Sequence, residues 1–277
     1  MEYSKKRESL KDFFYEIRNC SKCQLSQTRT NFVFGSGSAD AKIMFVGEAP
    51  GKNEDLQGKP FVGQAGKLLD DLLGSIGLSR GEVFIANVLK CRPPLNRDPR
   101  IEEINICKGY LFKQIEIIDP IIICTLGRHS TQLMLNTDEG ISKLRGKVFK
   151  IKNRYILPIN HPAAVLYTPS RLDILKEDFL RLKKVMLMTE SYDSDTLNHM
   201  NMIVEEFENG IGELENKDFS KTDNLDKSED FVNENFNKKG SQDISSKLDE
   251  DAKKNIENEN LTKKLVNHKK DDQMELF

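Results

Sequence analysis

The sequence has no apolar run long enough to cross a lipid bilayer, and its first ten residues contain no apolar segment like that of a signal peptide. These absences predict a cytoplasmic protein. A phosphate-binding loop that ends in Lys-Ser or Lys-Thr is also missing, which disfavours a nucleotide-binding flavodoxin-like protein. Because disulfides are rare in a reducing cytoplasm, the cysteines are expected to bind a metal or to remain free thiols.

Charge divides the chain in two. The segment 1–190 contains 30 Lys and Arg against 22 Asp and Glu, and the segment 191–277 contains 12 against 22. The first segment is long enough for one compact domain, and its positive charge favours a polyanionic partner. The second is rich in Asn, Asp, Glu, Lys and Ser with scattered apolar residues, so it is predicted to be a disordered acidic tail. The tail either screens the basic domain or is simply solvated.

Hydrophobic periodicity predicts strands that alternate with helices. Helices are expected over 4–18, 66–76, 101–118 and 169–188, strands over 42–46, 83–88, 120–126 and 155–159, and an edge strand or hairpin over 145–152. This order predicts a three-layer α/β/α fold with a central, mostly parallel four-stranded sheet. Glu48, Asn87 and His161 each fall at the end of a predicted strand. Functional loops in such sheets lie beyond the carboxyl ends of the strands, so these residues should converge.

Four cysteines form a close pair and two distant partners. Cys20 and Cys23 make a Cys-x-x-Cys pair, and Cys91 and Cys107 lie far along the chain. Four thiolates gathered in this way suit a tetrahedral zinc ion or an iron–sulfur cluster, and spacing alone does not choose between them. The fifth, Cys124, lies in an apolar strand and is expected to be an inert core residue.

Several motifs occur together in one order. They are Gly-Glu-Ala-Pro-Gly at 47–51, Gly-Lys-Pro-Phe-Val-Gly at 58–63, Asn-Val-Leu-Lys-Cys-Arg-Pro-Pro-x-Asn-Arg at 87–97 and His-Pro-Ala at 161–163. With the four cysteines, the segment from about residue 10 to about residue 185 resembles the family 4 uracil-DNA glycosylases, thermophilic-type enzymes that carry a 4Fe–4S cluster. Ala49 stands where the crosslinking relatives have Gln, and their long basic insertion is missing, so the ordinary hydrolytic enzyme is predicted.

This resemblance implies a monofunctional DNA repair enzyme. It would release uracil from single- or double-stranded DNA and leave an abasic site, acting as a monomer near the nucleoid. No lysine is clearly placed to form a Schiff base, so strand cleavage is not expected. The resemblance implies a structural 4Fe–4S cluster, rather than zinc, on Cys20, Cys23, Cys91 and Cys107. The alternative is a non-catalytic, metal-containing nucleic-acid-binding or replication-associated protein with the same fold.

Three side chains are candidates for binding the uracil base. Phe61 is the expected stacking platform, although a phenylalanine here can also be a core residue. Asn87 is the expected reader of the base edge, because its carboxamide can accept from N3–H and donate to O4. His161 is the expected donor to O2 as negative charge develops. His129 is a weaker candidate for that role and is expected at the start of a helix.

A carboxylate is also expected near the sugar. Glu48 and Glu54 compete for the role of orienting water or stabilising the cationic sugar, and the sequence does not rank them. Gly47 and Ala49 are small enough to let backbone N–H groups approach the base or a phosphate.

Contacts to DNA are predicted from the loop 161–171 and from the basic segment around Cys91. Val165, Leu166 and Tyr167 are candidate wedges for the space left by the flipped nucleotide, and Arg171 is a candidate phosphate contact. Related sequences often have Arg where this chain has Tyr167. The basic residues that are expected to contact the phosphate backbone, or to be merely solvated, are Lys90, Arg92, Arg97 and Arg100.

The last residues form a short motif of their own. Gln273, Leu276 and Phe277 lie in a Gln-x-x-Leu-Phe segment. This segment resembles the peptide with which bacterial repair proteins dock on the replication sliding clamp. A long flexible tether suits such docking.

Overall fold

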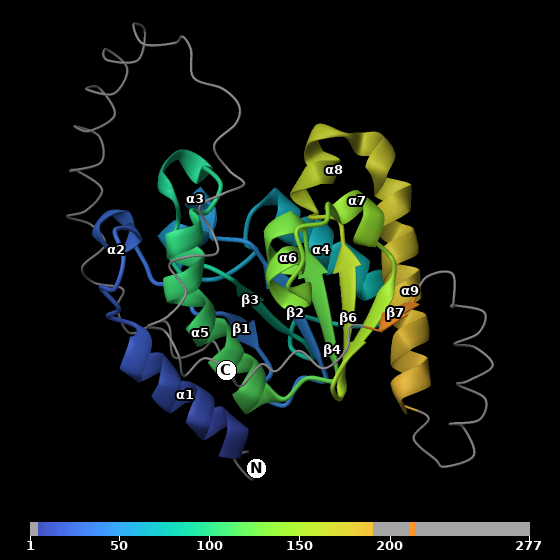
Figure 1. The fold of residues 1–277 in the computed structure, drawn as a ribbon, viewed down its shortest axis with the longest axis horizontal. Helices are drawn as coiled ribbons and strands as arrows, with labels where there is room; N and C mark the ends of the chain where they lie inside the picture. Colours follow the sequence, from blue (N-terminus) through green and yellow to red (C-terminus); the bar gives the residue numbers. More distant parts are fainter. Residues whose placement is uncertain (1–4, 191–210, 214–277) are drawn as a thin grey trace, which may run out of the picture. The chain divides into compact units, whose positions relative to one another are not determined.

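The computed structural model describes residues 5–190 and 211–213 (Figure 1). Apart from 211–213, the predicted acidic tail lies outside the described residues, and so does the clamp-like motif with Gln273, Leu276 and Phe277. None of the helices in the described ranges is both long enough and apolar enough to span a membrane.

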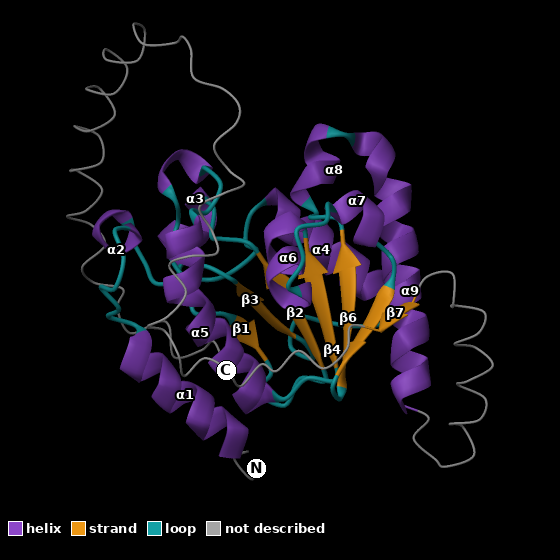
Figure 2. Ribbon diagram, viewed as in Figure 1, coloured by secondary structure: helices purple, strands orange, loops and turns teal. Residues whose placement is uncertain are grey.

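The described residues form one mixed sheet with the strand order β1-β3-β2-β4-β6-β5-β7 (Figure 2). Its four central strands run parallel, which confirms the predicted four-stranded core. They are β3 (Phe84–Asn87), β2 (Ile43–Gly47), β4 (Ile122–Leu126) and β6 (Arg154–Ile159). Every residue of β2, β3 and β4 is buried, because helices cover both faces of a parallel sheet.

Short strands extend the sheet at both edges. On one side β5 (Val148–Ile151) pairs antiparallel with β6, which confirms the hairpin predicted over 145–152. The unexpected strand β7 (Ile211–Glu213) pairs parallel with β5. On the other side the unexpected two-residue strand β1 (Ser36–Gly37) pairs antiparallel with β3.

The long helices form two layers around the sheet. Helix α4 (Gln64–Ser75) connects β2 to β3, whereas α5 (Ile101–Ile118) and α6 (Arg128–Leu135) follow β3 and β4 and lead in the opposite direction across the sheet. Because such crossovers are right-handed, α4 lies on one face and α5 and α6 lie on the other. Helix α9 (Leu172–Glu190) joins the α4 face, and α1 (Lys5–Ile17) packs against α5 (Figure 1).

Alternating side chains of the strands fill these two layers. Phe45 stacks on Phe179 of α9 with ring centroids 6.0 Å apart, and Cys124 belongs to the same buried cluster. The neighbouring Thr125 therefore points to the opposite face, where its hydroxyl lies 2.8 Å from that of Thr131 in α6. Cys124 is fully buried, which confirms that it is a core residue.

Short helices connect the longer elements. The segment 161–171, predicted as a loop, is largely helical, because Pro162 has the backbone angle of a first helical residue and two alanines follow it. The short helices are α2 (Leu25–Thr28), α3 (Lys52–Gln57), α7 (Ile141–Leu144) and α8 (Ala163–Tyr167), with 3₁₀ turns at η1 (Pro94–Asn96) and η2 (Pro169–Arg171).

The topology places the strand ends that carry the motifs at one edge of the sheet. Gly47 is paired with Asn87 and Leu126 with Ile159, so the loops after these residues begin at neighbouring positions. The chain leaves β2 toward α4 on one face and leaves β4 toward α6 on the other. Parallel α/β folds commonly bind ligands at such a reversal of strand order.

Candidate active site

Gly47 lets Asn87 and Phe61 meet above the end of β2. A Cβ atom at Gly47 would lie 2.3 Å from Oδ1 of Asn87 and 2.8 Å from Cζ of Phe61. Both distances are shorter than any real Cβ contact, so a side chain at this position would displace one of them. Glu48 and Ala49 follow directly and are partly exposed. Gly47 therefore makes room for the side chains of Asn87 and Phe61.

Asn87 carries a buried polar atom with no partner. The residue is 2% exposed, and its backbone carbonyl accepts a hydrogen bond from Nζ of Lys90 at 2.8 Å. Within the described part of the chain, its side-chain Oδ1 is buried and accepts no hydrogen bond. An unpaired buried acceptor costs about 1–3 kcal/mol. An acceptor kept unpaired at a strand end is what a ligand-binding carboxamide requires.

Lys90 supports Asn87 from inside the protein. Its side chain is fully buried, and Nζ also donates to Oε1 of Gln114 at 2.6 Å. Burial lowers the pKa of Lys90 to about 8, and the neighbouring thiols of Cys107 and Cys91 oppose this change. The prediction that Lys90 contacts the DNA backbone is therefore wrong.

Phe61 lies on an uncommon backbone conformation that its surroundings hold in place. Its φ of +51° is left-handed, which few residues other than glycine adopt. The guanidinium of Arg80 donates to the carbonyl of Pro60 at 3.1 Å and also to the carbonyl of Phe61. The ring is 5% exposed and stacks on the imidazole of His161, with centroids 5.4 Å apart and planes 25° from parallel.

Glu54 fixes the same segment from the other side. Its Oε2 accepts from the backbone N–H of Gly51 at 3.1 Å, and its Oε1 accepts from the N–H groups of Val62 at 3.0 Å and Gly63 at 3.2 Å. Both carboxylate oxygens are thus engaged with backbone. Glu54 joins the start of α3 to the loop that carries Phe61.

His161 is held as one tautomer. Its Nδ1 accepts a hydrogen bond from the backbone N–H of Ala163 at 3.1 Å. Burial lowers the pKa of His161 to about 4, and Glu54 opposes this effect. The imidazole is therefore neutral at physiological pH, and because Nδ1 is an acceptor, the proton is on Nε2. The ring offers a single N–H donor.

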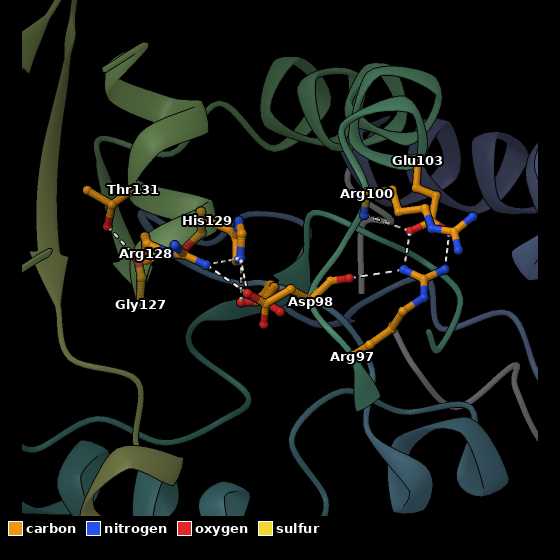
Figure 3. Close-up of polar contacts among 10 residues, drawn as sticks. Arg97, Asp98, Arg100, Glu103, Gly127, Arg128, His129 and Thr131 are labelled. Atoms are coloured by element: carbon orange, nitrogen blue, oxygen red, sulfur yellow. Dashed lines mark hydrogen bonds and ion pairs between the residues drawn. The ribbon is translucent and has the colours of Figure 1, made fainter. Parts of the chain in front are cut away.

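Glu48 belongs to a polar cluster at the ends of β2 and β4. Its Oε2 lies 3.8 Å from Nε2 of His129, the second residue of α6. The same nitrogen lies 3.5 Å from Oδ2 of Asp98 and 3.0 Å from Nη2 of Arg128. Arg128 in turn donates to Oδ2 of Asp98 at 2.8 Å (Figure 3). This cluster joins the loops that follow β2, β3 and β4.

The cluster also changes the acidity of Glu48. Burial raises the pKa of Glu48 above its usual range, and Asp98 raises it further, whereas His129 and Arg128 act in the opposite direction. Its backbone is fixed, because the carbonyl of Glu48 accepts from the N–H of Leu89 at 3.0 Å. Glu48 is thus a partly desolvated carboxyl group with a basic neighbour.

The four cysteines Cys20, Cys23, Cys91 and Cys107 lie close together at the loop that follows β3. Hydrogen-bond donors surround three of the sulfur atoms, as is common around cluster-bound thiolates. Arg29 donates to Cys91 at 3.2 Å, and the hydroxyl of Tyr110 donates to Cys20 at 3.2 Å. The backbone N–H of Lys90 donates to Sγ of Cys107 at 3.4 Å. None of the five cysteines forms a disulfide.

The spacing of these sulfurs is informative about the metal. Burial raises the pKa of Cys91, and the nearby thiols of Cys23 and Cys20 raise it further, so the sulfurs are neighbours. In the described ranges, however, no three of them lie within 4.8 Å of one another. A tetrahedral zinc with bonds of about 2.3 Å would bring its sulfur ligands to within about 3.8 Å of each other. A single zinc ion would therefore require these sulfur atoms to lie closer together than they do here.

The predicted DNA-contacting residues divide into exposed and buried ones. Leu166 and Tyr167 at the end of α8 are 44% and 88% exposed, and Arg171 is exposed in η2. Val165 packs in the core, so the prediction that it reaches the DNA is wrong. Arg97 pairs through both Nη atoms with the carboxylate of Glu103, at 2.9 and 2.5 Å, which ties it to α5 (Figure 3).

Sequence reasoning missed several supporting residues. Asp98, Arg128 and Arg80 were not singled out, and His129 was considered only as an anion stabiliser. The position of Arg128 and His129 directly after β4 was the available signal, because the other site residues also follow strands. Asp98 and Arg80 lie in loops without periodicity, and their contacts depend on the fold.

Known proteins resemble this chain over the same region. The model of the uracil DNA glycosylase superfamily matches residues 34–184. A type-4 uracil-DNA glycosylase of Sulfurisphaera tokodaii is 50% identical over 197 residues, 68% of this chain and 90% of that protein. The type-4 uracil-DNA glycosylase of Archaeoglobus fulgidus is 49% identical over 183 residues, 63% of this chain and 92% of that protein. That of Saccharolobus solfataricus is 52% identical over 181 residues, 62% of this chain and 83% of that protein. The chain belongs to the type-4 uracil-DNA glycosylases of the uracil-DNA glycosylase superfamily.

Proposed function

We propose that this protein hydrolyses the bond between uracil N1 and the deoxyribose C1′ in DNA. Water adds to C1′ as the bond breaks, uracil leaves as an anion that takes up a proton, and an abasic site remains. The uracil must first leave the base stack, which costs a few kcal/mol. The protein then has to recognise the base, stabilise its negative charge and stabilise the positive charge of the sugar.

The buried, unpaired Oδ1 of Asn87 carries this proposal. It accepts from uracil N3–H, and the amide nitrogen donates to O4, while the base stacks on Phe61 beside Gly47. Cytosine has an acceptor at N3 and a donor at N4, so both contacts would be lost. Each buried polar group left unpaired would then cost about 1–3 kcal/mol.

His161 stabilises the departing uracil as a neutral donor. Its Nε2–H is directed to uracil O2, and its Nδ1 remains bound to the N–H of Ala163. Since the imidazole stays neutral down to about pH 4, it stabilises developing charge without giving up a proton in the ground state. One such donor in a dry site contributes about 3 kcal/mol to transition-state stabilisation.

Glu48 is the catalytic carboxylate and Glu54 is a positioning residue. Glu54 uses both oxygens to hold backbone N–H groups, so it stabilises the Phe61 loop. Glu48 lies beside His129 at the end of β2, where a carboxylate can orient water and stabilise the cationic sugar. The neighbouring Ala49 is small and leaves room for the nucleotide.

Cys20, Cys23, Cys91 and Cys107 hold a 4Fe–4S cluster. The open spacing of the sulfurs and the surrounding donors support this assignment over zinc. When bound, the group supplies structural stability rather than electron transfer, because the hydrolysis moves no electrons. Its ligands would tie the segment after α1 to the loop that follows Asn87.

The protein engages DNA through exposed residues near the site. Leu166 and Tyr167 fill the space left by the flipped uracil, and Arg171 contacts a phosphate. The segment with Gln273, Leu276 and Phe277 docks on the sliding clamp. Deleting 273–277 is expected to abolish clamp binding in a pull-down while uracil release from short oligonucleotides stays unchanged, and loss of both would contradict this separation.

Release of free uracil from a U-containing oligonucleotide tests the proposed function. Wild type and an Asn153→Ala control, in the exposed turn between β5 and β6, should release uracil at equal rates. Asn87→Ala should lower the single-turnover rate about 100-fold, because two contacts to the base are lost. If wild type with intact metal releases no uracil, the protein is a non-catalytic nucleic-acid-binding member of the family.

A further inference from the structure

Leu95 has an unusual combination of exposure and backbone conformation. It lies in η1, directly after the Pro93-Pro94 pair, and its side chain is 94% exposed. Its φ of +55° and ψ of +20° are left-handed. In the described residues the only apolar side chains on such a backbone are those of Phe61 and Leu95. Phe61 belongs to the active site, and single exposed leucines are common, so the backbone is what distinguishes Leu95.

The surrounding loop holds Leu95 in this conformation. Nε of Arg92 donates to Oδ1 of Asn96 at 2.7 Å across the turn, and the Arg97–Glu103 pair anchors its far end to α5. Unfavourable backbone conformations persist where the neighbouring structure imposes them, and they concentrate at functional sites. The loop therefore presents an apolar side chain to solvent on a rigid support.

The position and charge of this loop favour DNA as the group that covers Leu95. Asp98, three residues later, lies 3.5 Å from His129, which lies 3.8 Å from Glu48, so the loop borders the active site. The loop leads into α5 at the end of the sheet where α8 also lies (Figure 1). The segment 91–100 itself contains three arginines and one aspartate, and one of these arginines, Arg97, is paired with Glu103 of α5.

We propose that Leu95 is a second apolar wedge, which inserts against the bases next to the flipped uracil. It acts in addition to Leu166 and Tyr167, and its rigid support lets it enter the base stack without an ordering cost at binding. This inference rests on the proposed function, since it requires DNA as the substrate. A second copy of this chain is the competing occupant of the exposed leucine.

The Leu95→Gly variant tests whether Leu95 inserts into DNA or only supports the fold. Glycine adopts φ near +55° without strain, so this variant should melt at or above the wild-type temperature. At the same time its Kd for a duplex with one U·G pair should rise about tenfold, because the variant has no apolar side chain to insert between the bases. If Leu95 only supported the fold, its replacement would not weaken DNA binding while the melting temperature stayed the same or rose.

A second exposed leucine provides the control for this experiment. Leu180→Ala changes a leucine of α9 that is 56% exposed and should bind DNA as wild type does. Wild type that releases no uracil would overturn the proposed function itself. Wild type that is active beside a Leu95→Gly variant with unchanged duplex affinity would overturn only the wedge. If that variant changes only the sedimentation coefficient, Leu95 contacts a second copy instead.

Discussion

Glu48→Gln and Glu54→Gln should separate catalysis from stability. Glu54 accepts three backbone hydrogen bonds on two oxygens, and glutamine keeps only one oxygen. At least one N–H loses its acceptor and faces an NH₂ group instead. Hydrogen bonds to charged groups contribute about 1.5–3 kcal/mol each, so the free energy of unfolding should fall by about 2–4 kcal/mol. In a domain of this size that lowers the melting temperature by about 5–15 °C.

Glu48→Gln should instead lose activity and keep its stability. Removing the carboxylate should lower the single-turnover rate of uracil release about 100-fold or more. The raised pKa of Glu48 means that ionising it costs more in the folded than in the unfolded protein. Glutamine removes this cost, so the variant should be at least as stable as wild type, and the difference should grow as pH rises above the usual range of a glutamate.

Both variants are measured by calorimetry and by single-turnover uracil release at a temperature where each is folded. Glu54→Gln should melt at a lower temperature than wild type and keep most of its activity. Glu48→Gln should melt at the wild-type temperature or above and lose its activity. Activity lost in Glu54→Gln without a change in melting temperature, beside an active Glu48→Gln, would refute the assignment of the two roles.

Three further predictions concern the base site and the cysteines. Gly47→Val should abolish uracil release with the protein still folded, because its side chain would collide with Asn87 and Phe61; activity within threefold of wild type would contradict the described packing. By ¹⁵N NMR, His161 should be the Nε2–H tautomer with no titration between pH 5 and 8, and a titration midpoint near 6.5 would contradict the neutral imidazole. Because its folded pKa is lowered to about 4, the free energy of unfolding should fall as pH drops from about 6.5 toward 4. Purified protein should absorb visible light, and Cys107→Ser should lose this absorbance and melt earlier; a colourless protein with bound zinc would refute the iron–sulfur assignment.

Much of the fold was predictable because long buried elements have clear periodicity. The four central strands and the helices at 101–118 and 169–188 carry enough apolar residues to reveal their type. Strand β1 has only two residues, and α3 and α8 have no more than six, which is too short for a periodic signal. The helix within 161–171 was missed because its prolines suggested a loop.

The site was predictable where a side chain ends a strand. Asn87 ends β3, and Glu48 and His161 follow β2 and β6, so their place at one edge of the sheet could be predicted. Lys90 was misjudged because its burial depends on Gln114, which lies 24 residues later in the sequence. The roles of Glu48 and Glu54 could not be ranked from the sequence, since the difference lies in which backbone N–H groups each carboxylate reaches.

The most direct test of the account is the base specificity of Asn87→Asp. Wild type and the variant are given matched oligonucleotides that contain a single uracil or a single cytosine, and the released base is quantified. We expect wild type to release uracil alone, and the variant to lose most uracil release and gain detectable cytosine release, because an aspartic acid can accept from N4 and donate to N3. Undiminished uracil release by Asn87→Asp would mean that the unpaired oxygen at the end of β3 does not read the base.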